Sequence, residues 1–163
     1  NPCPCGYFGD SDRNCTCTMG TITRYQKRIS GPLLDRIDIH IDVPKVDFEK
    51  LTGNRTGEES SIIQRRVEKA REKQLIRFQS KSQVCNADMG PREVRECCDP
   101  GSEGLNLLRQ AMKKLNLTAR GYHRVLKLSR TIADLAGEDN IRATHLAEAL
   151  QYRPRRWMEP GLS

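Results

Sequence analysis

The sequence predicts a mainly α-helical protein, in which a helical bundle follows a cysteine-rich loop, a short helix and one strand. Two observations support this prediction. The 163-residue chain is 36% hydrophobic, 30% charged and only 5% aromatic, a composition that suits a solvated helical protein better than an aromatic-rich β-sandwich. From Ser60 onward, apolar residues also recur with the period of about 3.6 residues that marks amphipathic helices.

Charge and hydropathy exclude several classes of protein. No apolar stretch approaches the roughly 18 residues that span a bilayer, and residues 1–20 lack the apolar core of a signal peptide. We therefore expect a cytoplasmic protein without a membrane partner.

The net charge of +7 permits an anionic partner such as nucleic acid, although charge alone does not establish one. Because the first residue is Asn rather than Met, we interpret the chain as a fragment of a longer protein.

Four of the seven cysteines lie within the first 17 residues, with the spacing C-x-C-x9-C-x-C: Cys3, Cys5, Cys15 and Cys17. Two such pairs that close one turn-rich loop can present four thiolates to a tetrahedral ion, as in structural zinc sites. Reduced thiols and disulfides are the alternatives, although an odd number of cysteines fits a fully bonded secreted domain poorly. Four protein ligands leave no open coordination position, so zinc bound here would be structural.

The remaining cysteines, Cys85, Cys97 and Cys98, lie in or near a region with helical periodicity. We expect them to be buried apolar residues rather than metal ligands.

Between the cysteines and Ser60, the sequence predicts a short helix, a strand and a loop. The helix covers Ile22 to Arg28 and is ended by Gly31 and Pro32. The segment Ile37–Val43 then alternates apolar and polar residues with period two, which is typical of a strand. A loop over residues 44–59 follows. We place a domain boundary in it, which separates a domain of residues 1–57 from a helical domain of residues 58–158.

The helical domain begins with a predicted helix from Ser60 to Phe78. Six residues fall near its inner face: Ile62, Ile63, Val67, Ala70, Gln74 and Phe78. The charged residues opposite them are expected to form a solvated surface. After a polar loop with a short turn at 86–89, four further helices are predicted from capping and breaking signals and from apolar periodicity: 91–98, 105–115, one that starts at Thr118 and ends at Gly137, and 143–152.

Basic residues are concentrated between residues 104 and 133, where seven Lys or Arg occur and no Asp or Glu. Arg120, Arg124 and Lys127 follow i, i+4, i+7 spacing and so share one helix face. Arg120 lies in the first helical turn, where a cation opposes the helix dipole unless an anion is present. This pattern favours a phosphate ligand near Arg120, and a plain solvated face is the alternative.

Three stretches in this order resemble the end of an AAA+ ATPase module of the magnesium-chelatase and minichromosome-maintenance branch. They are the opening Asn1-Pro2, the run GPLLDRID at 31–38, and TARG at 118–121. The opening NPCPCGYFGD and the later YHRVLKLSRTIADLAG narrow the resemblance to bacterial magnesium-chelatase-like competence proteins of the ComM type. The resemblance covers about residues 1–158, and its helical domain would be the AAA+ lid.

The resemblance implies a role for each matching residue. Asn1 would be the sensor-1 residue that positions the attacking water. Arg36 would be the arginine finger, which stabilises charge on the phosphoryl group in a neighbouring subunit. Arg120 would be the sensor-2 arginine of the lid. Arg124 and Lys127 are our candidates for nucleic-acid contact, with nucleotide and solvent as alternative neighbours.

The resemblance also implies ATP and magnesium as cofactors of the full-length protein, a hexameric homo-oligomer, and DNA as a partner. The chain contains no G-x-x-x-x-G-K-[ST] loop, so we do not expect it to hydrolyse ATP alone. The cysteine insertion is missing from simple magnesium-chelatase subunits, which favours a DNA-remodelling motor that acts in branch migration during natural transformation. A magnesium-chelatase ATPase subunit, or a stand-alone basic zinc module that binds nucleic acid, is the alternative.

Overall fold

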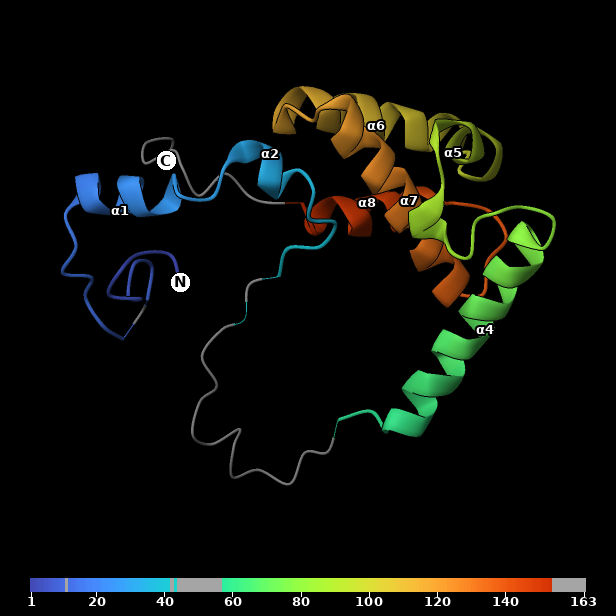
Figure 1. The fold of residues 1–163 in the computed structure, drawn as a ribbon, viewed down its shortest axis with the longest axis horizontal. Helices are drawn as coiled ribbons and strands as arrows, with labels where there is room; N and C mark the ends of the chain where they lie inside the picture. The colour runs from blue at the N-terminus through green and yellow to red at the C-terminus, as the bar shows by residue number, and fades with distance from the viewer. Residues whose placement is uncertain (11, 42, 44–56, 154–163) are drawn as a thin grey trace. The chain divides into compact units, whose positions relative to one another are not determined.

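The structure, a computed structural model, describes residues 1–10, 12–41, 43 and 57–153. The described residues divide into two compact units, residues 1–37 and residues 38–153, and each is described by itself. Regular structure within them is helical, which confirms the predicted mainly α fold (Figure 1). None of the helices in these ranges combines the length and the apolar character needed to cross a bilayer.

The first unit contains the cysteine loop and two helices, α1 (Met19–Gln26) and α2 (Gly31–Leu34). Helix α1 was predicted, but it begins earlier because the Thr18 side chain caps it and accepts a hydrogen bond from the Thr21 N–H. Helix α2 was not predicted, since its Gly-Pro start was interpreted as a helix stop. Proline is compatible with the first helical turn, however, and Ser30 supplies the cap.

The strand predicted over residues 37–43 is wrong: residues 37–41 and 43 adopt no strand in the structure. Alternating apolar residues form a strand only when a neighbouring strand completes the hydrogen-bond ladder. In the described ranges no strand is present to do so. Instead, the His40 N–H donates to the carbonyl oxygen of Tyr152 at 2.9 Å. Ile37, Ile39 and Ile41 are all exposed.

The second unit is a bundle in which every helix predicted after Ser60 is present (Figure 1). Its elements are α4 (Ser60–Phe78), the 3₁₀ turn η1 (Asn86–Asp88), α5 (Pro91–Cys97), α6 (Gly101–Leu115), α7 (Ala119–Leu135) and α8 (Ala143–Gln151). The predicted Thr118 cap is confirmed: its hydroxyl accepts the Gly121 N–H at 3.0 Å. The loop predicted over residues 44–59 falls mostly outside the described residues.

Helix α7 is the centre of this unit, since α4, η1, α5 and α8 all pack against it. Val125 and Ala133 of α7 are fully buried in one core with Leu146 of α8. Helices α6 and α8 approach closely at Gly104, where a Cβ atom would lie 2.5 Å from Cδ1 of Leu146. The small glycine therefore sets the distance between these two helices.

Only the C-terminal half of α4 joins the core. Ala70, Gln74 and Phe78 are buried, whereas Ile62, Ile63 and Val67 are 40–44% exposed. The prediction that these last three residues face inward is therefore wrong. The N-terminal half of α4 projects beyond the bundle (Figure 1), so the apolar stripe continues past the surface that α7 covers.

The three later cysteines differ in environment. Cys98 is buried as predicted, with its thiol 3.8 Å from Sδ of Met89, and burial raises the pKa of Cys98 to about 12. Cys97 is partly buried against the same core. Cys85 is only partly buried, and its thiol lies 3.3 Å from Oδ2 of Asp88. The burial prediction is thus confirmed for Cys98 alone.

Candidate functional site

The four N-terminal cysteines form one cluster, in which all four sulfur atoms lie within 4.8 Å of one another. The sulfur of Cys3 is 3.3 Å from that of Cys5 and 3.6 Å from that of Cys15. These separations are longer than a disulfide bond, and all four thiols are free. Zn–S bonds of about 2.3 Å in a tetrahedron place sulfur atoms about 3.8 Å apart. The cluster can therefore hold a tetrahedral metal ion with little rearrangement.

Tight turns bring the two cysteine pairs together. The Gly6 N–H donates to the Cys3 carbonyl oxygen at 3.0 Å, and Gly6 has a φ of 86°, a left-handed conformation that glycine adopts without strain. Further along the loop, the carboxylate of Asp10 accepts the N–H of Asp12 at 2.8 Å and that of Arg13 at 3.1 Å. These local hydrogen bonds explain why sequence spacing was enough to predict the cluster.

Hydrogen bonds within the cluster give its thiols different pKa values. The backbone of Tyr7 and the Cys3 thiol lower the pKa of Cys5 to about 6. The backbone of Cys17 lowers the pKa of Cys15, but burial and hydrogen bonds with the other cysteines outweigh it and raise that pKa to about 12. The cluster thus favours one thiolate near neutral pH, and a divalent cation would allow its neighbours to ionise as well.

The second candidate site is a groove of about 560 Å³ in the helical unit. It is bordered by residues 119–131 of α7, by the η1–α5 segment and by Asp38 and Ile39. Three predicted site residues line it together, namely Arg120, Arg124 and Lys127. The i, i+4, i+7 spacing on α7 therefore gathers these three side chains at one groove, as we expected of a shared face.

The three cations of the groove differ in what they contact. Arg120 is exposed in the first turn of α7. Arg124 forms an ion pair with the carboxylate of Asp38, and Nζ of Lys127 donates to the Ala87 carbonyl oxygen at 2.9 Å. His123 also lines the groove. Neither Asp38 nor His123 was predicted as a site residue. His123 could have been found from its i+3 spacing after Arg120, whereas nothing in the sequence links Asp38 to a residue 86 positions away.

The two predicted catalytic residues lie in the first unit, and both are exposed. Asn1 stands two residues before Cys3, at the start of the cysteine loop. Arg36 follows α2 in a tight turn, in which its N–H donates to the Leu33 carbonyl oxygen at 3.0 Å. Both side chains are thus on the surface of a compact unit, accessible to a ligand or a partner.

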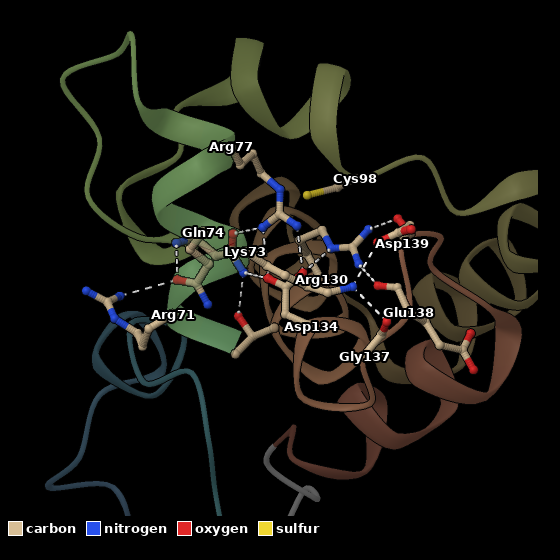
Figure 2. A network of polar contacts seen from close by, with 12 residues as sticks. Arg71, Lys73, Gln74, Arg77, Cys98, Arg130, Asp134, Gly137, Glu138 and Asp139 are labelled. Carbon is tan, nitrogen blue, oxygen red and sulfur yellow. Dashed lines mark hydrogen bonds and ion pairs between the residues drawn. The ribbon is translucent and has the colours of Figure 1, made fainter. Parts of the chain in front are cut away.

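A buried polar network near the C-terminal end of α7 holds this helix in place (Figure 2). Arg77 of α4 makes two hydrogen bonds to the Asp134 carboxylate, at 2.8 and 2.6 Å, and Asn86 donates to the same carboxylate at 2.8 Å. The hydrogen bond to Asp134 raises the pKa of Arg77 despite partial burial. The network therefore connects α4, η1 and α7 through one carboxylate.

Arg130 belongs to this network and not to the basic surface. It is buried, and its guanidinium donates to Asp134 at 3.2 Å and to the carbonyl oxygens of Glu138 and Asp139 at 2.8 and 2.6 Å. Lys73 of α4 reaches the same turn through the Gly137 carbonyl oxygen at 2.7 Å (Figure 2). One of the seven basic residues noted in the sequence is thus structural and unavailable to a ligand.

Comparisons with known proteins match both parts of the chain. Residues 57–153 match the family described as "Magnesium chelatase, subunit ChlI C-terminal", and residues 1–51 match "Magnesium chelatase, subunit ChlI". The chain is 41% identical over 155 residues to the competence protein ComM of Haemophilus influenzae and 38% identical to the uncharacterised protein YifB of Escherichia coli. Each alignment covers 94% of this chain but 29% of the relative. The chain thus spans less than a third of their length.

Proposed function

Because this chain belongs to the magnesium chelatase ChlI family, we propose that it is the C-terminal part of an AAA+ motor that couples ATP hydrolysis to DNA remodelling. The observation that carries this proposal is the groove along α7, where Arg120, Arg124 and Lys127 meet. A basic groove at the start of a helix suits phosphate groups, because guanidinium and ammonium groups bind phosphate oxygens through charge-assisted hydrogen bonds.

Three residues would act on the nucleotide in the full-length protein. Exposed at the start of α7, Arg120 would bind a phosphate of the ATP. Arg36 would reach the nucleotide of a neighbouring subunit, since its turn after α2 presents it at the surface. Asn1 would orient water by hydrogen bonding. ATP with magnesium supplies the phosphoryl group and part of the charge neutralisation.

Arg124 and Lys127 would meet the phosphates of nucleic acid at the same groove. The proposal also includes a hexameric ring, a cytoplasmic location and a domain boundary at residues 57–58. Support for DNA as the substrate comes from the family relationship to a protein named for competence, together with the positive charge of this helix face.

The proposal is tested by ATP turnover of the full-length protein, measured alone, with DNA and with a porphyrin plus magnesium. We expect DNA to stimulate turnover and the porphyrin to have no effect. Stimulation by the porphyrin alone would instead favour a magnesium-chelatase subunit, the family's namesake activity. Salt-sensitive DNA binding without turnover by the full-length protein would favour a nucleic-acid-binding module.

We further propose that the cysteine cluster binds one structural zinc ion. Elemental analysis of the purified chain should find about one zinc per molecule, because four thiolates at this spacing close a tetrahedral shell. Cys3→Ser should lose the metal, since Cys3 is the buried member of the cluster. The matched control, Cys97→Ser, changes a cysteine outside the cluster and should retain it. A metal-free protein with four titratable N-terminal thiols would contradict this proposal.

A further inference from the structure

One acidic side chain lines the basic groove. Asp38 faces a wall that carries Arg120, His123, Arg124 and Lys127, and its carboxylate is ion-paired with the guanidinium of Arg124. Among the described residues that line the groove, Asp38 is the one with a carboxylate. It therefore stands where an anionic ligand of the groove would place its own charge.

The contacts of Arg124 suggest that this ion pair can be exchanged. The Asp38 side chain is 53% exposed and that of Arg124 25%, so water and solutes reach the pair. Partly exposed ion pairs contribute little to stability. The Nε atom of Arg124 is buried and finds no hydrogen-bond acceptor among the described residues. Arg124 therefore has a donor that Asp38 does not use, and a phosphate group with several oxygens could satisfy it.

We infer that Asp38 is an internal anion that occupies the basic groove until a phosphate group displaces it. The inference rests on the proposed function, because it takes phosphate, of a nucleotide or of nucleic acid, as the ligand of the groove. Asp38 follows Arg36 by two positions in the chain. Phosphate binding would thus free the Asp38 carboxylate, two positions after the proposed arginine finger in the sequence, from its ion pair with Arg124.

The test compares binding of inorganic tripolyphosphate to the 163-residue chain and to Asp38→Asn by isothermal titration calorimetry at low salt. The substitution removes the competing charge, so we expect the dissociation constant to fall about fivefold, the effect of one partly exposed ion pair. Glu72→Gln is the matched control. It makes the same charge change on an exposed position of α4 outside the groove, and it should leave the dissociation constant unchanged. Asp38→Glu should restore the weaker binding.

A double-mutant cycle tests whether Asp38 weakens phosphate binding through its ion pair with Arg124. If Asp38 competes through its pair with Arg124, Asp38→Asn should tighten binding in the natural chain and have little effect in an Arg124→Gln background. Circular dichroism of each variant checks that the helices are retained. A single-stranded oligonucleotide titrated in parallel distinguishes the two sources of phosphate, since tightening for one probe only assigns the groove to nucleotide or to nucleic acid.

Two results would overturn the inference, and they differ in what else they contradict. Equal affinities of the natural chain and Asp38→Asn would show that Asp38 does not compete, while the groove would remain a phosphate site as proposed above. If no variant binds either probe, the groove is not a phosphate site, and the roles proposed for Arg120, Arg124 and Lys127 fail with the inference.

Discussion

Replacing Arg36 by alanine in the full-length protein is expected to lower ATP turnover by about a thousandfold or more, the effect of losing an arginine finger. In this role the guanidinium stabilises the charge that develops on the transferred phosphoryl group, an interaction made only in the transition state. The affinity for nucleotide should therefore change little. Steady-state hydrolysis and equilibrium binding of a fluorescent nucleotide, measured on the same preparation, separate the two effects.

The control for this experiment is Arg24→Ala. Arg24 is an exposed arginine on α1 of the same unit, so its loss makes the same change in net charge without touching the proposed finger. It should leave turnover near that of the natural protein. Unchanged hydrolysis in Arg36→Ala, or an equal loss in both variants, would contradict the role that we propose for Arg36.

Replacing Asp134 by alanine is expected to destabilise the helical unit by about 3–5 kcal/mol, as when one partner of a buried ion pair is removed. The Asp134 side chain is fully buried and accepts hydrogen bonds from Arg77, Arg130 and Asn86. Without its carboxylate, two guanidinium groups would lie in or near the core with no counter-charge. Urea unfolding of the chain followed by helical circular dichroism measures the loss.

Asp139→Ala is the matched control for this second prediction. Asp139 also pairs with a lysine from α4, but its side chain is 93% exposed. Its removal should cost no more than about 1 kcal/mol, as for exposed ion pairs. A similar loss of stability in the two variants would show that burial of the Asp134 network is not what stabilises the contact between α4 and α7.

The helices of the second unit could be predicted because the signals that form them are local. Thr118 caps α7, proline starts α5, and apolar periodicity marks the buried faces of α6, α7 and α8. The predicted strand failed because strand formation depends on a partner that alternation in one segment cannot supply. The prediction that the N-terminal half of α4 faces inward was wrong for a related reason. Periodicity predicts which face of a helix is apolar but does not say how far the neighbouring helix extends.

The candidate sites differ in the same respect, namely whether their residues come from one segment or from several distant ones. The cysteine cluster closes within one loop, so the spacing of its residues was sufficient to predict it. The three cations of the groove share one helix and could also be placed together. Asp38 and the Asp134 network bring together residues from distant segments, and charged residues such as Arg130 and Arg77 look like surface residues in the sequence. Only packing shows that both are paired with Asp134, and that Arg130 is buried and Arg77 partly buried.

The shared carboxylate of Asp134 also has an evolutionary consequence. Because Arg77 and Arg130 both depend on it, loss of Asp134 leaves two guanidinium charges unbalanced in or near the core, whereas loss of either arginine still leaves one Arg–Asp pair. Neutral drift that begins at Asp134 would therefore pass through an unstable protein. We expect related sequences to keep an acidic residue at this position wherever either arginine is kept, so that an alignment would show the arginines being lost before the aspartate.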